Sequence, residues 1–164
     1  MDFDDIDQIK EFGFTGFIAF SELLFDKSTV PLEKGVYLVL NPKRTAELLP
    51  VGSGGCFRGK NPNVPIDILK SHWIDDVLVV YVGKAGGKGK IATLQSRLLQ
   101  YARFGRGENA CHYGGRYIWQ LSNSADLIVC WKPTPYNNPR EVEHELIAAF
   151  KRKYGRRPFA NLQD

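Results

Sequence analysis

This sequence of 164 residues has little cysteine, no long apolar run and no basic, apolar start. Its three cysteines, Cys56, Cys111 and Cys130, are odd in number and show no CxxC spacing. That pattern argues against a disulfide framework or a cysteine-based zinc site and favours the reducing cytoplasm. No apolar run approaches the roughly 20 residues of a membrane span, and the start, MDFDDIDQIK, is acidic rather than signal-like. We therefore expect a cytoplasmic protein with no membrane partner.

The length and composition predict a single domain over 1–164, since 43% of the residues are apolar and 24% charged. The charge is unevenly distributed. Residues 1–26 carry seven acids and one base, a balance of −6, whereas residues 27–164 carry 21 bases and 11 acids, a balance of +10. A basic body suits a polyanionic partner such as DNA or RNA, although solvated lysine faces give the same balance. We interpret 1–33, rich in acids and Phe, as an extension that covers one face of a sheet.

Three segments have the pattern of buried strands. In 35–40, GVYLVL, period-2 alternation places Tyr37 and Val36 on opposite faces. Residues 77–82, VLVVYV, are an unbroken apolar run typical of a strand buried on both faces, and 125–132, ADLIVCWK, is the third strand. Together they predict an α+β fold, in which a small, mostly antiparallel three-stranded sheet has helices packed on its faces.

The connection 41–73 between the first two strands is long, and connections of that length are usually functional or mobile. It contains GGCFRGK, which fits the first seven positions of the phosphate-loop pattern GxxxxGK[ST]. We reject a nucleotide-binding loop, because Asn61 replaces the metal-binding hydroxyl and no buried strand leads into the motif.

Shorter elements are also expected: helices at 18–25 and 44–49 and a strand at 118–121.

Two helices carry a charged residue on their apolar stripe. From Leu94 onward, apolar residues recur at helical spacing, and Arg97 falls among them. In the last helix, 139–153, Glu143 shares a stripe with Ile147 and later apolar residues. A buried charge is costly without a partner. Arg97 could therefore pair with a protein carboxylate, Glu143 included, or with a phosphate brought by a ligand.

Taken in order, these segments resemble the GIY-YIG nuclease family. The triplet GVY at 35–37 resembles the first signature triplet and YVG at 81–83 the second. Arg97 matches the Arg of the following helix, Glu143 the metal-binding Glu, and Asn161 the Asn that closes the motif set. The resemblance runs in the family's order over 34–162. This chain departs from it in the length of 41–73, an insertion, and in Tyr101, which stands where many members have His.

The resemblance implies a metal-dependent endonuclease that hydrolyses phosphodiester bonds in DNA. Arg97 would stabilise the transition-state charge, and Glu143 would hold Mg²⁺ or Mn²⁺, with waters and a phosphate oxygen completing the coordination. Tyr37 would orient or deprotonate the attacking water, helped by a cation that lowers its pKa, with Lys84 the nearest candidate. Tyr81 would hold water or phosphate. Second-rank members of this site are Lys84, Tyr101 and Asn161.

The basic loops 84–90 and 103–117 are the expected DNA track, and 41–73 is expected to govern substrate choice. The cations on this track are Lys88, Lys90, Arg103, Arg106 and Arg116. His112 is too isolated for a metal site and receives no role.

Two alternatives stay open. One is a non-catalytic nucleic-acid-binding module on the same fold, and the other is a protein-interaction domain with a structural Arg97–Glu143 pair. Whether two copies form a homodimer to cut two strands is also left open.

Overall fold

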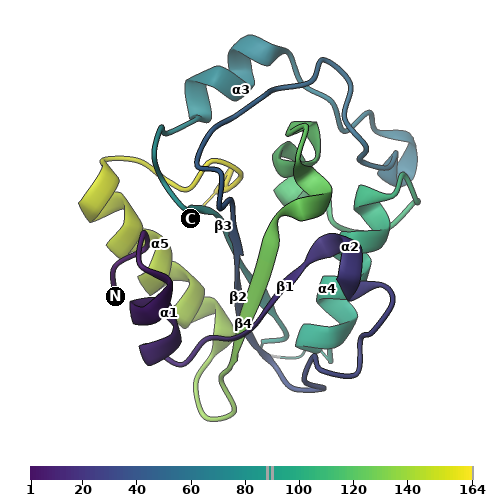
Figure 1. Ribbon diagram of the computed structural model, residues 1–164. Helices are drawn as coiled ribbons and strands as arrows, with labels where there is room; N and C mark the ends of the chain where they lie inside the picture. The colour runs from purple at the N-terminus through teal and green to yellow at the C-terminus, as the bar shows by residue number, and fades with distance from the viewer. Residues whose placement is uncertain (88, 90, 164) are drawn as a thin grey trace.

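The computed structural model describes residues 1–87, 89 and 91–163, and it shows one antiparallel sheet with helices on both faces (Figure 1). The strands, in the sheet order β1-β4-β2-β3, are β1 Thr15–Ala19, β4 Ile128–Pro133, β2 Gly35–Leu40 and β3 Val79–Ala85. The α-helices are α1 Ile6–Glu11, α2 Phe20–Leu23, α3 Ile66–His72, α4 Leu94–Gly105 and α5 Pro139–Tyr154. The 3-10 segments are η1 Phe57–Gly59, η2 Tyr113–Gln120 and η3 Ser124–Asp126. None of the helices in the described part of the chain combines the length and the apolar character needed to cross a membrane.

The predicted α+β class is confirmed, but the sheet has four strands rather than three. The missed strand is β1, where a helix at 18–25 was expected and only the short α2 forms. In β1 the pairing with β4 shifts between Gly16 and Ile18, and Phe17 has a left-handed φ of 56°. A bulge of this kind adds an unpaired residue and disrupts the period-2 pattern by which a strand is found in a sequence.

Other boundaries also differ from the prediction. β3 begins at Val79 rather than at 77 and continues through Lys84 to Ala85, because these residues pair with the start of β2. No helix forms at 44–49, where Leu48 instead forms a β-bridge to Leu121. The expected strand at 118–121 is the end of η2, whose last residues are all buried and therefore resemble a core strand.

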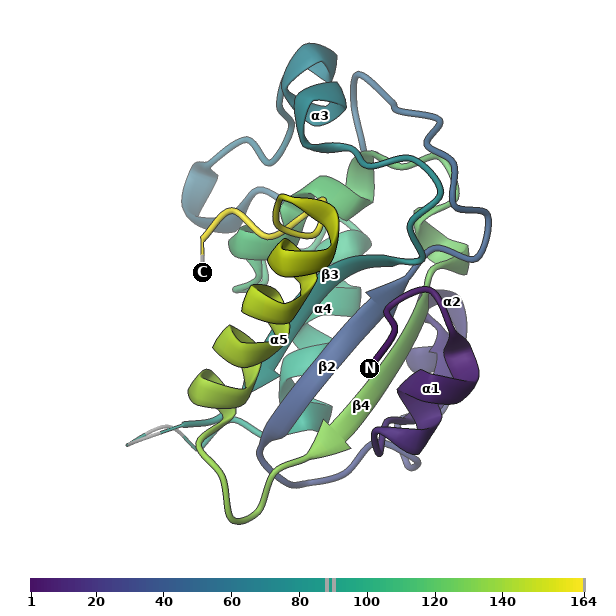
Figure 2. The same cartoon turned by 90° about the vertical axis from the view of Figure 1, so that its left-hand side faces the viewer.

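The sheet separates two apolar cores. Tyr37 and Val39 of β2 belong to the core on the α4 side, which we call the α4-side core. Val36 and Leu38 belong to the core on the α5 side, the α5-side core, as the alternation predicts. Figure 2 shows α1 and α5 in front of the sheet and α4 behind it, with β3 as an edge strand between α5 and α4. Each of these two helices therefore presents its side chains to a different face of β3.

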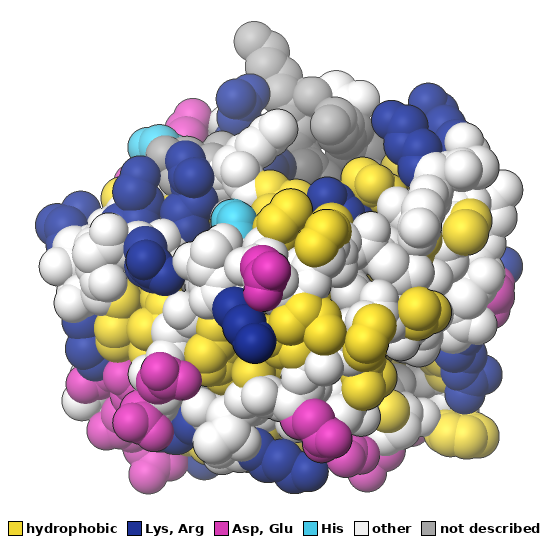
Figure 3. Space-filling model, turned by 90° about the horizontal axis from the view of Figure 1, so that it is seen from above, with side chains coloured by type: hydrophobic (Ala, Val, Ile, Leu, Met, Phe, Trp, Pro, Cys, Tyr) yellow, Lys and Arg dark blue, Asp and Glu magenta, His cyan; other side chains and the backbone are white. Residues whose placement is uncertain are grey.

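The insertion 41–73 lies over one end of the sheet, where its backbone is hydrogen-bonded to α4 and η2. Gly55 N donates to Phe104 O at 2.8 Å, and Ser53 N donates to Trp119 O at 3.0 Å. At the C-terminal end of α3, Arg156 Nη1 donates to Ser71 O at 2.9 Å. Figure 3 looks down on α3 and shows Lys and Arg side chains gathered on the side where α5 ends. Arg156 therefore helps to hold the end of α3 in place, in addition to contributing positive charge.

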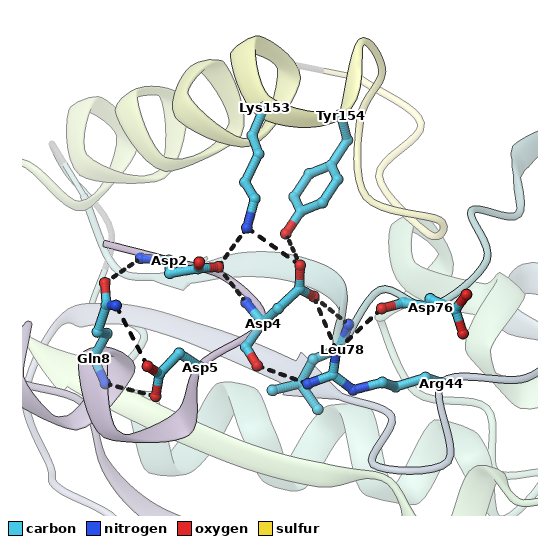
Figure 4. Close-up of polar contacts among 9 residues, drawn as sticks. All are labelled: Asp2, Asp4, Asp5, Gln8, Arg44, Asp76, Leu78, Lys153 and Tyr154. Atoms are coloured by element: carbon cyan, nitrogen blue, oxygen red, sulfur yellow. Dashed lines mark hydrogen bonds and ion pairs between the residues drawn. The ribbon is translucent and has the colours of Figure 1, made fainter.

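The first part of the acidic N-terminal segment packs against one face of the sheet, with Phe3 and Phe14 buried in the core on the α5 side. The segment 1–33 does not simply cover that face, however, because it supplies β1 and buries Phe20 and Leu23 in the core on the α4 side. Figure 4 shows the polar contacts that hold it. The carboxylate of Asp4 accepts hydrogen bonds from Leu78 N at 2.9 Å, from Lys153 Nζ at 3.2 Å and from the Tyr154 hydroxyl. Asp4 therefore joins the N-terminal segment both to α5 and to the residues that lead into β3.

We expect Asp4→Ala to lower the free energy of unfolding at pH 7 by about 1–3 kcal/mol, because several donors lose their acceptor. Burial alone would raise the pKa of Asp4, but the hydrogen bonds from Tyr154, Leu78 and Lys153 lower it on balance. Since its pKa is lowered in the folded state, the contribution is present above about pH 4 and is lost as the pH falls through the folded pKa. Urea denaturation at pH 7 and pH 3 should therefore show a smaller difference at pH 3. Glu11→Ala, on exposed surface, is the control, and an equal loss in both variants would contradict the role of Asp4.

Candidate functional site

A cleft of about 700 Å³ lies at the edge strand β3 and brings together residues from both faces of the sheet. All four core residues of the predicted site line it. Tyr37 comes from β2, Tyr81 from β3, Arg97 from α4 and Glu143 from α5. Because β3 is the edge strand of the sheet among the described residues, side chains of α4 and α5 can meet around its outer side. The topology of the sheet thus creates the cleft.

Arg97 and Glu143 do not pair with each other in the part of the chain that the structure describes; Glu143 forms its ion pair with Lys84. Alternation along β3 explains this pairing, since Lys84 shares a face with Val82, which lies in the α5-side core. Arg97 lies on α4, behind the sheet. The Glu143 side chain is 13% exposed and the Lys84 side chain 31%. The interaction-domain alternative therefore loses the ion pair on which it rested.

The Arg97 guanidinium is held at the cleft by the loop that follows α4. Its Nη1 donates to Cys111 O at 2.8 Å. Burial alone would lower the pKa of Arg97, but the hydroxyls of Tyr37 and Tyr81 raise it on balance. Nη1 also donates to Gln100 Oε1 at 3.5 Å. Arg97 is therefore a permanently charged donor beside two phenols, and these two hydrogen bonds from Nη1 fix its direction.

Tyr37 and Tyr81 are protonated at neutral pH. Burial raises the pKa of Tyr37 well above its ordinary value, and Arg97 only partly opposes this effect. Burial likewise raises the pKa of Tyr81 to about 12. The cation that acts on both phenols is Arg97 rather than Lys84, and neither pKa falls. The expectation that Lys84 lowers the pKa of Tyr37 is therefore wrong.

The ring of Tyr37 lies over Gly83, its partner across the β2–β3 pair. A Cβ on Gly83 would lie 2.3 Å from Cζ of Tyr37 and 2.5 Å from its hydroxyl oxygen. No side chain fits there without moving the ring. Gly83, in the second triplet YVG, thus leaves the space that the ring of Tyr37, in the first triplet GVY, occupies.

No role was expected for His112, yet its ring contacts the expected site. The hydroxyl of Tyr37 and Nε2 of His112 lie 2.8 Å apart, and His112 is fully buried. Burial, aided by the charge of Arg97, lowers the pKa of His112 well below its ordinary value, so the ring is neutral at pH 7. Its tautomer sets the direction of the bond: with the proton on Nδ1, Nε2 accepts from Tyr37. No sequence spacing could reveal this contact, because a loop brings His112 across the cleft.

Two second-rank residues serve neighbouring groups. Tyr101 stacks on His112 with ring centroids 3.5 Å apart and donates its hydroxyl to Gly115 O at 2.6 Å. It supports His112 rather than lining the cleft. Asn161 lines the cleft, but its side chain accepts from Val82 N at 2.9 Å and donates to Val82 O at 2.8 Å. Its amide thus makes the two hydrogen bonds to the Val82 backbone that a neighbouring strand would otherwise make at the edge of β3.

Of the cations expected on a DNA track, Arg116 lines the cleft. Arg103 points elsewhere on α4 and pairs with Glu108 at 2.6 Å. Arg106 lies over the exposed ring of Phe25, 5.9 Å from its centroid. Lys88 and Lys90 lie outside the described residues.

The donor set for a metal ion is small. Among the described residues, no group of three or more His, Cys, Asp or Glu side chains is placed to hold a metal. Glu143 is the acidic side chain that lines the cleft. A single carboxylate suits Mg²⁺, which keeps several waters and is often bound through one or two carboxylates and substrate phosphates. Glu143 is therefore compatible with a metal that becomes fully coordinated only with substrate.

Comparison with known proteins found no match: no protein-family profile, no curated protein and no solved structure matches the chain.

Proposed function

We propose that this protein is a nuclease of the GIY-YIG type that hydrolyses phosphodiester bonds in DNA with the help of a divalent metal ion. The observation that supports this most is the convergence of Tyr37, Tyr81, Arg97 and Glu143, from four different elements, on one cleft. These residues occupy the order that the resemblance requires. The surplus of cations over 27–164 suits the same partner.

Arg97 would bind the scissile phosphate. Its planar fork matches phosphate oxygens, and its charge offsets the additional negative charge of the transition state. Its Nη1 contact with Cys111 O keeps the guanidinium in one orientation before substrate binds. Such preorganisation reduces the reorganisation needed at the moment of reaction.

Tyr37 would orient the attacking water, and Nε2 of His112, 2.8 Å from the Tyr37 hydroxyl oxygen, would fix the direction of that hydroxyl. With its raised pKa, Tyr37 is a poor base, and the lowered pKa of His112 makes that ring a poor base as well. In the proposed step, the attacking water therefore loses its proton to solvent in the cleft as its oxygen bonds to phosphorus. The bond to the leaving 3′ oxygen breaks, and that oxygen takes up a proton from water. Tyr101, stacked on His112, holds the ring in place against Tyr37.

Glu143 would hold the Mg²⁺ or Mn²⁺, which, when bound, would act as a Lewis acid toward the phosphate and the leaving oxygen. Lys84 neutralises Glu143 in the structure described here. We infer a cytoplasmic location for this activity, since Cys56, Cys111 and Cys130 are all free thiols. A homodimer would allow cleavage of both strands.

The test is incubation of supercoiled plasmid with the protein and Mg²⁺ or Mn²⁺, beside a reaction with EDTA. We expect nicked or linear product only where metal is present. Nicked product alone indicates cleavage of one strand, and direct conversion to linear DNA supports a homodimer. Binding without cleavage would instead support the non-catalytic binding module, and absence of both would support an interaction domain.

A further inference from the structure

Arg116 is oriented at the cleft by two aromatic rings. Its guanidinium carbon lies 4.1 Å from the ring centroid of Tyr113 and 5.1 Å from that of Tyr117. A cation beside aromatic faces gains favourable electrostatic energy, and the planar guanidinium stacks well on such rings. Tyr113 and Arg116 both line the cleft, as Arg97 does. The cleft therefore holds a second arginine on an element different from α4.

The donors of Arg116 are only partly used. Nη1 donates to Tyr113 O at 3.2 Å, whereas the buried Nε has no partner in the part of the chain that the structure describes. No carboxylate among the described residues pairs with Arg116. A guanidinium has five N–H donors, and a buried donor without an acceptor is costly. This arrangement suits an anionic acceptor supplied by a ligand.

The insertion supports this arginine. The Tyr113 hydroxyl donates to Asn61 O at 3.1 Å, and Lys60 Nζ lies 5.9 Å from the Tyr113 ring centroid. Lys60 and Asn61 therefore contact Tyr113 on the side of the cleft where Arg116 lies, and Lys60 adds a positive charge there.

We propose that Arg116, oriented by Tyr113 and Tyr117, binds a second phosphate of the polynucleotide, next to the phosphate that Arg97 binds. This inference rests on the proposed function and specifies its substrate: a chain with consecutive phosphates rather than an isolated diester. The insertion 41–73 contributes to substrate choice by fixing Tyr113. The chemistry recognised is that of consecutive phosphodiesters, which a planar guanidinium binds through paired hydrogen bonds.

The experiment compares two substrates in Arg116→Gln and wild type. One is a DNA oligonucleotide, and the other is bis(p-nitrophenyl) phosphate, which has a single phosphodiester. We expect kcat/KM for the oligonucleotide to fall about 10- to 100-fold, the range for a charged hydrogen bond, with the small diester unchanged within about twofold. Arg58→Gln is the matched control, since Arg58 lies over the Phe57 ring at 5.1 Å but does not line the cleft.

A second measurement is the dependence of DNA affinity on salt, in EDTA. Loss of one phosphate contact should reduce the slope of log K against log salt concentration by about 1. An equal loss of activity on both substrates, or an unchanged slope, would overturn the proposal. If wild type cleaves neither substrate, the proposed hydrolysis fails while the salt slope still decides whether Arg116 binds phosphate. The melting temperature of Arg116→Gln shows whether an altered fold explains any loss.

Discussion

Arg97→Ala is expected to lower kcat for plasmid cleavage by about 10²–10³-fold, the usual effect of removing one preorganised donor to a transition-state oxyanion. Glu143→Gln should lower it at least as much, because a neutral amide is a poor ligand for Mg²⁺. Both residues line the cleft but lie on helices at opposite faces of the sheet. The two losses would therefore come from separate roles at one phosphate rather than from breaking one ion pair.

Stability distinguishes these roles from structural ones. Arg97 contributes a hydrogen bond to Cys111 O and Glu143 an ion pair with Lys84, so each variant should lose only about 1 kcal/mol of unfolding free energy. Arg103→Ala on α4 and Glu145→Gln on α5 are matched controls outside the cleft, and both should cleave as wild type does. Large losses of stability in the two site variants, with cleavage falling only in proportion to the folded fraction, would refute the assigned roles.

Gly83→Ala is expected to impair stability and activity together. Its added Cβ would lie 2.3 Å from Cζ of Tyr37, whose ring is fully buried and would have to move. Overpacking of this kind costs about 1–3 kcal/mol, which for a chain of this size lowers Tm by roughly 3–10 °C. A displacement of about 1 Å at the Tyr37 hydroxyl would lower kcat by about 10²-fold.

Gly114→Ala is the control for stability, because a Cβ on Gly114 meets no atom within 4 Å and its φ is not positive. Gly114 lines the cleft, so the plasmid assay compares Gly83→Ala with wild type instead. If Gly83→Ala unfolds as Gly114→Ala does and cleaves as wild type does, the packing of Tyr37 over Gly83 is incorrect.

The sequence by itself determined those elements whose apolar residues keep an unbroken period. The period-2 pattern of 35–40 and the helical spacing from Leu94 and from Pro139 predicted β2, α4 and α5. Such elements can be predicted because a strand or helix that buries one face repeats its apolar residues at a fixed spacing along the sequence. Where a bulge broke the period, as in β1, the prediction failed. The expected site residues came from the resemblance to the GIY-YIG family.

Only the tertiary structure decided which side chains meet. Helical spacing showed that Arg97 and Glu143 each face a core, but it could not show that the sheet lies between these cores, so that Glu143 pairs with Lys84. Nor could it place His112 against Tyr37 or select Arg116 over Arg103 for the cleft. Periodicity records the face on which a residue lies within its own element, whereas contacts across a cleft depend on how loops and edge strands bring distant segments together.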